Sequence, residues 1–298
     1  MSATVRVPAK VNVQLAVGGA RPDGFHDLAN VFLAVGLYDE VTVSEADSFT
    51  LTCTGPGSVP VPEVPLDRTN LAARAAIELG RRYDIAPDVR IHIAKDIPVA
   101  GGMAGGSADA AGALLACDAL WGTNASREEL LDICAELGSD VPFSLVGGAA
   151  LGTGRGEKLE PLDVGGEFWW VFAAADGGLS TPAVYREFDR LSPEAPDPVA
   201  APALLEALRT GDVEALAATV TNDLQPAALS LFPSLKDTLD AGTSAGALAA
   251  LVSGSGPTTA FLVADESSAR KVAAALTGIA GCRSARVASS PARGATIL

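Results

Sequence analysis

A glycine-rich loop that leads into a helix is the feature of this sequence that most restricts its fold. The segment Pro98-Val-Ala-Gly-Gly-Met-Ala-Gly-Gly-Ser-Ala-Asp109 follows an alternating apolar and polar stretch over 89–93 and precedes an Ala- and Leu-rich stretch that ends near Trp121. These patterns predict a strand, a loop and a helix in succession. Glycines before a helix let backbone N–H groups approach an anion at the positive end of the helix dipole. The loop therefore predicts a phosphate site or, alternatively, a turn that packs a helix closely.

The spacing of this loop excludes two common nucleotide-binding motifs. A Walker A loop needs Lys where Ser107 stands. A Rossmann fingerprint needs G-x-G-x-x-G inside a βαβ unit, and neither the spacing nor the surrounding pattern agrees. A second glycine cluster, Ser253-Gly-Ser-Gly-Pro257, lies between two predicted strands in the other half of the chain. It is either a structural turn or a further source of N–H donors.

Two charged residues are candidates for chemistry at a phosphate site. Alternation over 4–17 predicts a strand with Lys10, Asn12 and Gln14 on one face. Lys10 is either a cation that faces a cleft or an edge-strand lysine that prevents aggregation. Asp140 stands at the start of a predicted helix, where it is either a helix cap or a carboxylate that accepts a proton from a substrate hydroxyl. Periodicity does not separate these alternatives.

Composition excludes several classes of function. With 21 Lys and Arg against 36 Asp and Glu, the net charge is -15, which argues against nucleic acid or an anionic membrane as a partner. The four cysteines are widely spaced and only two histidines are present, so no metal-ligand cluster is predicted. This cysteine usage and the lack of a signal-peptide pattern predict a cytoplasmic protein.

The irregular mixture of strands and helices predicts an α+β fold rather than a doubly wound parallel sheet. The chain has 298 residues, of which 48% are hydrophobic, so it is long and apolar enough for two domains with cores of their own. Glycines, a proline and charges over 159–167 suggest the boundary. We expect an N-terminal domain of residues 1–160 and a C-terminal domain of residues 161–298.

Four sequence blocks in one order and spacing resemble the GHMP kinase superfamily. They are Pro8-Ala-Lys-Val-Asn12, Arg21-Pro-Asp-Gly-Phe-His-Asp-Leu28, the loop from Ile97 to Ala111, and Leu137-Gly-Ser-Asp-Val-Pro142. Later blocks that also agree are Ser180-Thr-Pro182, Asn222-Asp-Leu-Gln-Pro226 and Ser253-Gly-Ser-Gly256, so the resemblance spans nearly the whole chain.

The resemblance implies a two-domain α+β kinase with its active site in the cleft between the domains. The first two blocks resemble a member that phosphorylates, with ATP, the 2-hydroxyl of 4-diphosphocytidyl-2-C-methyl-D-erythritol in non-mevalonate isoprenoid (terpenoid) biosynthesis. Mg²⁺ would arrive with ATP, and its protein ligands are not indicated. Lys10 and Asp140 match the catalytic pair. The residues that match the ATP loop are Pro98, Val99, Ala100, Gly101, Gly102, Met103, Ala104, Gly105, Gly106, Ser107 and Ala108. The residues that match substrate positions are Asn12, Phe25, His26, Thr181 and Tyr185, the two aromatics being placed to stack on cytosine.

Some residues depart from the commonest family pattern. Met103-Ala104 replaces Leu-Gly, Phe25 replaces a frequent Tyr, and Ala108 replaces a second Ser, which removes a possible hydroxyl contact to phosphate or Mg²⁺. Further cations at the site, or ordinary solvated charges, are Arg21, Lys95 and Arg155. The alternatives to this function are a sibling kinase for homoserine or a mevalonate derivative, and a regulatory protein that keeps the fold without catalysis.

Overall fold

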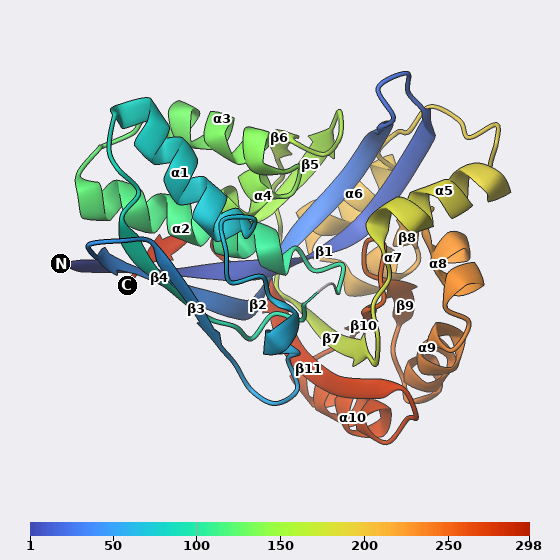
Figure 1. The fold of residues 1–298 in the computed structure, drawn as a ribbon. Helices are drawn as coiled ribbons and strands as arrows, with labels where there is room; N and C mark the ends of the chain where they lie inside the picture. Colours follow the sequence, from blue (N-terminus) through green and yellow to red (C-terminus); the bar gives the residue numbers. More distant parts are fainter. Residues whose placement is uncertain (100) are drawn as a thin grey trace.

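Two β-sheets, each packed against helices, make up the molecule, and one long hairpin runs through most of its length (Figure 1). The computed structural model describes residues 1–99 and 101–298. The first sheet has the order β12-β1-β2-β4-β3. In addition, β5 pairs with β2, β6 pairs with β5, and β8 pairs with β1. Its strands are β1 (Ser2–Ala20), β2 (His26–Glu45), β3 (Thr50–Thr54), β4 (Val89–Ala94), β5 (Ala149–Thr153), β6 (Lys158–Pro161), β8 (Thr221–Asn222) and β12 (Thr296–Ile297).

A bulge in β1 decides which polar side chains of the hairpin share a face. Asn12 pairs with Phe32 and Gln14 with Val31 of the neighbouring strand, so the register shifts between them. Beyond the bulge, the Gln14 side chain bonds the backbone of Val199 and Ala201. The expected alternation therefore holds for Lys10 and Asn12 and is wrong for Gln14, because one extra residue in a strand re-aims the side chains after it.

Helices α1 to α4 pack together over the first sheet, and α2 is the most deeply buried of them (Figure 1). Asn70 caps α1, and Ser126 with Glu129 forms the capping box of α3. Small residues line α2, so its backbone lies directly against the valines of β1 and β2. The helices are α1 (Leu71–Tyr83), α2 (Gly105–Trp121), α3 (Arg127–Leu137) and α4 (Val141–Val146), with a short 3₁₀ turn, η1 (Val61–Glu63).

The second sheet has the order β11-β7-β10-β9, and it is entirely antiparallel. Helices α9 and α10 pack against this sheet, and α5 packs on α8. Two strands of this half, β8 and β12, return to the first sheet, so the predicted boundary near residue 160 stays a prediction. The strands are β7 (Phe168–Ala175), β9 (Ala249–Val252), β10 (Thr259–Val263) and β11 (Cys282–Ser290). The helices are α5 (Thr181–Leu191), α6 (Pro202–Thr210), α7 (Val213–Ala217), α8 (Gln225–Leu231), α9 (Leu235–Ser244) and α10 (Glu266–Thr277).

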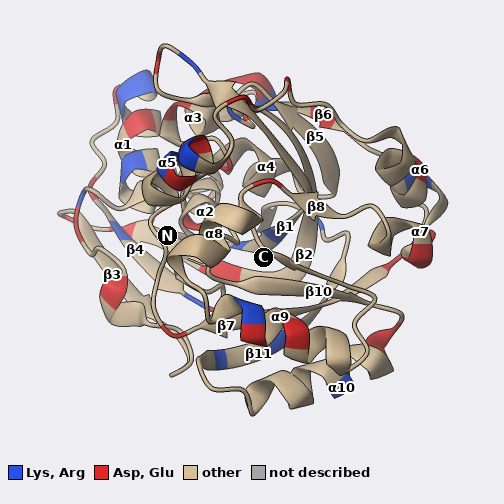
Figure 2. Cartoon of the chain, turned by 90° about the vertical axis from the view of Figure 1, so that its right-hand side faces the viewer, with Lys and Arg blue, Asp and Glu red and all other residues tan. Residues whose placement is uncertain are grey.

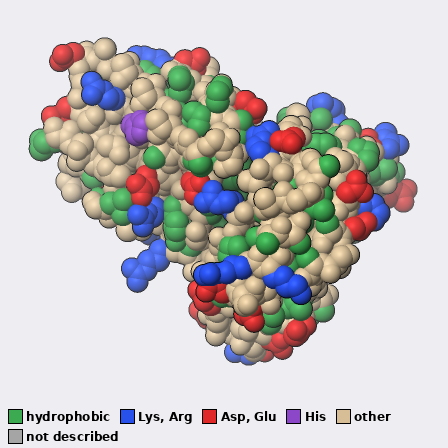
Figure 3. Space-filling model, turned by 90° about the horizontal axis from the view of Figure 1, so that it is seen from below, with side chains coloured by type: hydrophobic (Ala, Val, Ile, Leu, Met, Phe, Trp, Pro, Cys, Tyr) green, Lys and Arg blue, Asp and Glu red, His purple; other side chains and the backbone are tan. Residues whose placement is uncertain are grey.

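Charged side chains gather on the outer helices and loops, while the strands between them carry few (Figure 2). The face drawn in Figure 3 shows two lobes, on which basic and acidic side chains are interspersed with apolar ones. In the part of the chain that the structure describes, no helix is long and apolar enough to cross a membrane.

Because α2 packs closely on the sheet, one Gly→Ala substitution in this helix should destabilise the protein, although such substitutions usually stabilise helices. A Cβ at Gly112 would lie 2.8 Å from Val41 Cγ2 and 3.0 Å from Val7 Cγ2. Gly→Ala inside a helix normally gains about 1 kcal/mol, whereas overpacking costs about 1–3 kcal/mol. We expect Gly112→Ala to lower the free energy of unfolding in urea. Gly106→Ala, whose Cβ would meet only Leu71 at 3.8 Å, is the control and should not lower it.

Candidate functional site

One cavity of about 660 Å³ brings together residues that are far apart in the sequence. Its wall is formed by β1, the 24–30 region, the glycine-rich loop with the first turn of α2, the segment before α4, α5 and the second glycine cluster. The sequence-predicted residues that line it are Lys10, Asn12, Phe25, His26, Gly101, Gly102, Ala104, Gly105, Gly106, Ser107, Asp140, Thr181 and Tyr185.

Other predicted loop residues are not part of the cavity wall. Pro98, Met103 and Ala108 are buried and do not line it, and neither does Val99. Ala100 lies outside the described residues. Because the Ala108 side chain is fully buried, a hydroxyl at this position would begin inside the protein rather than in the cavity. The Ser107 side chain, by contrast, lies on the cavity wall.

The first turn of α2 offers its backbone N–H groups to the cavity. The helix starts at Gly105, and the residue before it, Ala104, has φ 60° and provides no side-chain cap. The N–H groups at the start of a helix have no partner within the helix, and with the helix dipole they form an anion site. A Cβ at Gly102, where φ is 73°, would overlap the carbonyl oxygen of Ser253. The second glycine cluster thus packs directly against the first.

Lys10 is buried in the cavity wall and makes three polar contacts. Its Nζ donates to Asn12 Oδ1 at 2.6 Å and to the Gly102 carbonyl at 3.0 Å, and lies 3.7 Å from Asp140 Oδ2. Asn12 is itself fixed by a 2.6 Å hydrogen bond from its Nδ2 to Asn30 Oδ1. Burial lowers the pKa of Lys10, and the Asp140 carboxylate opposes that shift. Since only 6% of the side chain is exposed, the edge-strand alternative is wrong.

Asp140 precedes α4 without capping it. Its side chain accepts no hydrogen bond from the first turn of that helix, and its backbone carbonyl bonds Ser144 instead. The carboxylate lies on the cavity wall beside the Lys10 ammonium. The interpretation of Asp140 as a side-chain cap is therefore wrong for this structure.

Aromatic and polar side chains form the other end of the cavity. The His26 ring lies 4.9 Å from the Tyr185 ring, and His26 Nε2 lies 2.7 Å from Asp189 Oδ1. Burial, and to a smaller degree Asp140, raises the pKa of Tyr185. The Phe25 side chain is 47% exposed and packs under the Arg155 guanidinium at 5.0 Å. Thr181 and Ser255 share a 2.9 Å hydrogen bond between their hydroxyls.

Sequence reasoning missed several residues of the wall. Asn30, Arg186, Asp189 and Ser255 line the cavity. Asn30 is on β2, and Arg186 and Asp189 are on α5, where the sequence predicted only Thr181 and Tyr185 as site residues. Helix α5 does carry a helical signal, with apolar residues at 184, 185, 188 and 191. Among the proposed extra cations, Arg155 lines the cavity, while Arg21 and Lys95 do not.

Comparisons with known proteins connect this geometry to a family. The family models for the GHMP kinases N terminal domain and the GHMP kinases C terminal match residues 70–148 and 204–280. The chain is 76% identical to a 4-diphosphocytidyl-2-C-methyl-D-erythritol kinase of Streptomyces avermitilis, over 100% of both chains.

Solved structures agree with these matches. A crystal structure of 4-(cytidine 5'-diphospho)-2C-methyl-D-erythritol kinase has a TM-score of 0.77 and 34% identity, covering 96% of this chain and 98% of that one. Homoserine kinase from Cytophaga hutchinsonii has a TM-score of 0.74 at 20% identity, covering 100% and 97%, which is a likeness of fold alone.

The pairing of Lys10 with Asp140 predicts a measurable shift. Asp140→Asn should lower the pKa of Lys10 further, because it removes the charge that opposes burial. The pKa is followed by ¹³C NMR titration of the lysine ε-carbon, assigned with a Lys10→Arg variant. With its pKa lower in the folded than in the unfolded protein, Lys10 destabilises the fold at neutral pH, and stability increases as pH rises between the two values. An unchanged or higher pKa in Asp140→Asn would contradict the pairing.

Proposed function

Because this chain belongs to the 4-diphosphocytidyl-2-C-methyl-D-erythritol kinases of the GHMP kinase superfamily, we propose that it transfers the γ-phosphoryl group of ATP to the 2-hydroxyl of that compound. The observation that carries the proposal is the 3.7 Å approach of Lys10 and Asp140 beside the free start of α2. A cation, a carboxylate and a phosphate-binding helix start then meet in one cavity.

The chain's own groups supply position and charge rather than covalent chemistry. Phosphoryl transfer spreads negative charge over the transferred group, and preorganised donors stabilise that charge. The start of α2 would hold the phosphates, and Lys10 would neutralise their charge. Asp140 would accept the proton of the substrate hydroxyl as the oxygen bonds to phosphorus. The Lys10 ammonium, 3.7 Å away, balances the negative charge of that carboxylate.

Mg²⁺ fits this cavity as an ion that enters with ATP. Magnesium in such sites is held by one or two carboxylates together with phosphate oxygens and water. The Ser107 hydroxyl and the Asp140 carboxylate are oxygen ligands of that kind on the cavity wall. Bound there, the ion would neutralise phosphate charge. The described residues contain no cluster of three or more His, Cys, Asp or Glu side chains that could hold a metal.

The far end of the cavity favours a substrate that carries a base. Phe25 and Tyr185 present aromatic surface to the cavity, and we propose that they stack on cytosine, with Asn12, His26 and Thr181 on the polar edges of the substrate. Homoserine and mevalonate derivatives offer no base for such stacking. The cytoplasmic location, with neither nucleic acid nor membrane as partner, remains a proposal supported by the charge of -15 and the free cysteines.

One assay tests the proposed function directly. ADP formation is coupled to a spectrophotometric readout with 4-diphosphocytidyl-2-C-methyl-D-erythritol, homoserine and mevalonate as parallel acceptors. We expect turnover with the first acceptor only, and ³¹P and ¹³C NMR of the product should place the new phosphate on the 2-oxygen. Faster turnover of homoserine or mevalonate would favour a sibling kinase, and no turnover of any acceptor would favour the regulatory alternative.

The loop assignment predicts a selective loss of nucleotide binding. Gly106 lies on the cavity wall, and a Cβ there would meet only Leu71 at 3.8 Å, so Gly106→Val should fold. Its side chain would obstruct the approach of phosphate to the first turn of α2. We expect the Kd of a non-hydrolysable ATP analogue to rise about 10-fold or more, while the Kd of the cytidine substrate changes little. Calorimetry measures both, and an unchanged nucleotide Kd would refute the loop assignment.

The stacking assignment predicts the opposite selectivity. Stacking of a base on an aromatic side chain contributes about 1–3 kcal/mol, so Tyr185→Ala should weaken the cytidine substrate about 5-fold to 150-fold. Affinity for the ATP analogue should remain within about 2-fold, because Tyr185 is on α5 and not in the loop. An equal loss of affinity for both ligands would mean that Tyr185 stabilises the fold and does not contact the substrate.

A further inference from the structure

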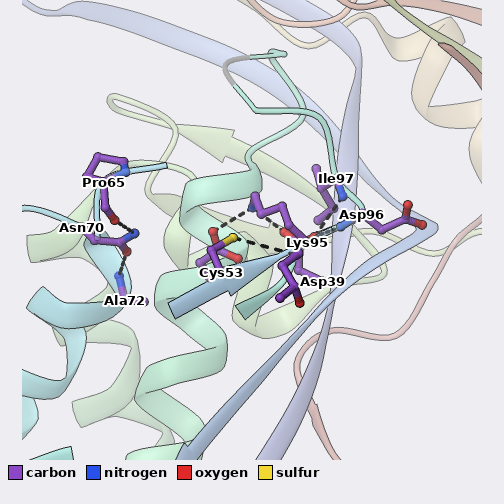
Figure 4. Close-up of polar contacts among 10 residues, drawn as sticks. Asp39, Cys53, Pro65, Asn70, Ala72, Lys95, Asp96 and Ile97 are labelled. Atoms are coloured by element: carbon purple, nitrogen blue, oxygen red, sulfur yellow. Dashed lines mark hydrogen bonds and ion pairs between the residues drawn. The ribbon is translucent and has the colours of Figure 1, made fainter. Parts of the chain in front are cut away.

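Three charged residues that do not line the cavity form a buried cluster next to the glycine-rich loop. Figure 4 labels two of them, Asp39 and Lys95. Lys95 Nζ donates to Asp39 Oδ2 at 2.5 Å and to Asp109 Oδ2 at 2.7 Å. The exposed fraction of the side chain is 2% for Lys95, 0% for Asp39 and 3% for Asp109. The residues come from the segment before the loop, from β2 and from α2, so the cluster joins three elements.

The cluster holds the two ends of the loop together. Before the loop, Asp39 Oδ1 accepts hydrogen bonds from the backbone N–H groups of Asp96 at 2.6 Å and Ile97 at 2.9 Å. After the loop, Asp109 lies on α2, and its Oδ2 accepts a hydrogen bond from the Lys95 ammonium. Between them, a Cβ at Gly105 would lie 3.0 Å from Lys95 Nζ, so the first turn of α2 lies directly on the ammonium.

A second ion pair ties the same segment to the other sheet. Asp96 points away from Lys95 (Figure 4), and both of its oxygens accept hydrogen bonds from the Arg286 guanidinium at 2.5 Å. Arg286 is on β11, so the residues before the loop are held from both sheets. Bidentate pairs of this kind fix orientation as well as distance.

Burying these charges is costly, and apolar residues of similar volume commonly stabilise a core as well or better. Asp109 Oδ1 has no hydrogen-bond partner in the described structure, and burial raises the pKa of Asp109 to about 7 although Lys95 opposes the shift. Because apolar residues could fill this part of the core and the charged cluster fixes a specific geometry instead, the arrangement points to a positioning role.

We propose that Asp39, Lys95 and Asp109 are positioning residues, which fix the two ends of the glycine-rich loop so that the free N–H groups of α2 converge on the phosphates of ATP. This inference rests on the proposed function only in taking ATP as the ligand of the loop. Loss of the cluster should therefore affect the nucleotide and leave the cytidine substrate, whose predicted contacts lie at the other end of the cavity, nearly unaffected.

The test compares Asp109→Ala and Asp109→Asn with Leu114→Ala, a matched control that truncates a buried side chain on the same helix. The Kd of a non-hydrolysable ATP analogue and of the cytidine substrate is measured by calorimetry, and stability by urea unfolding. We expect Asp109→Ala to raise the nucleotide Kd about 10-fold or more, since small misplacements of a binding group have large effects. Asp109→Asn keeps an acceptor for Lys95, so its nucleotide Kd should lie between those of Asp109→Ala and the wild type. Leu114→Ala should be destabilised with an unchanged nucleotide Kd.

The outcomes separate this inference from the proposed function. If the wild-type protein binds the nucleotide but does not phosphorylate the cytidine substrate, the proposed function fails while the Kd comparison still tests the cluster. If Asp109→Ala does not fold, Asp109→Asn alone tests the positioning role. We then expect the Kd of the ATP analogue to rise about 3-fold and the Kd of the cytidine substrate to stay unchanged. Equal nucleotide Kd values in the wild type and the folded Asp109 variants, or an equal loss in Leu114→Ala, would overturn the positioning role.

Discussion

The buried ammonium of Lys10 is the interaction on which the rest of the site depends. A buried charge is tolerated only when it is paired and hydrogen-bonded. Here Asn12, the Gly102 carbonyl and Asp140 provide the partners, and they come from β1, the glycine-rich loop and the start of α4. Satisfying one cation therefore fixes three elements relative to one another, and it places the charge where the phosphates are proposed to bind.

Small residues make this convergence sterically possible. Gly102 lies so close to Ser253 that no side chain fits, and Ser253 Oγ also donates to the Gly102 carbonyl at 3.1 Å. The glycine clusters of the two halves are thus one packed unit. The two sheets are further connected by β8 and β12, which return to the first sheet, and by the Asp96 pair with Arg286. Such connections favour a fixed relation between the halves of the cavity wall.

Local patterns predicted much of this arrangement, and the failures have physical causes. Alternation placed Lys10 and Asn12 on one face, as the strand pairing of β1 with β2 has it. The bulge after Asn12 reversed the face of Gln14, because register depends on the partner strand. Lys95 was a candidate for the site, yet two aspartates distant in sequence hold it in the core. Tertiary pairing of this kind leaves no mark in local periodicity.

We propose that Lys10 and Asp140 act together on the transferred phosphoryl group. The most direct measurement is single-turnover phosphoryl transfer by Asp140→Asn at saturating ATP and 4-diphosphocytidyl-2-C-methyl-D-erythritol. Asn keeps the size of the side chain but neither accepts the hydroxyl proton nor balances the charge of Lys10. We expect a folded variant that binds both substrates and transfers phosphate at least about 10²-fold more slowly. Transfer within a few-fold of the wild-type rate would contradict it.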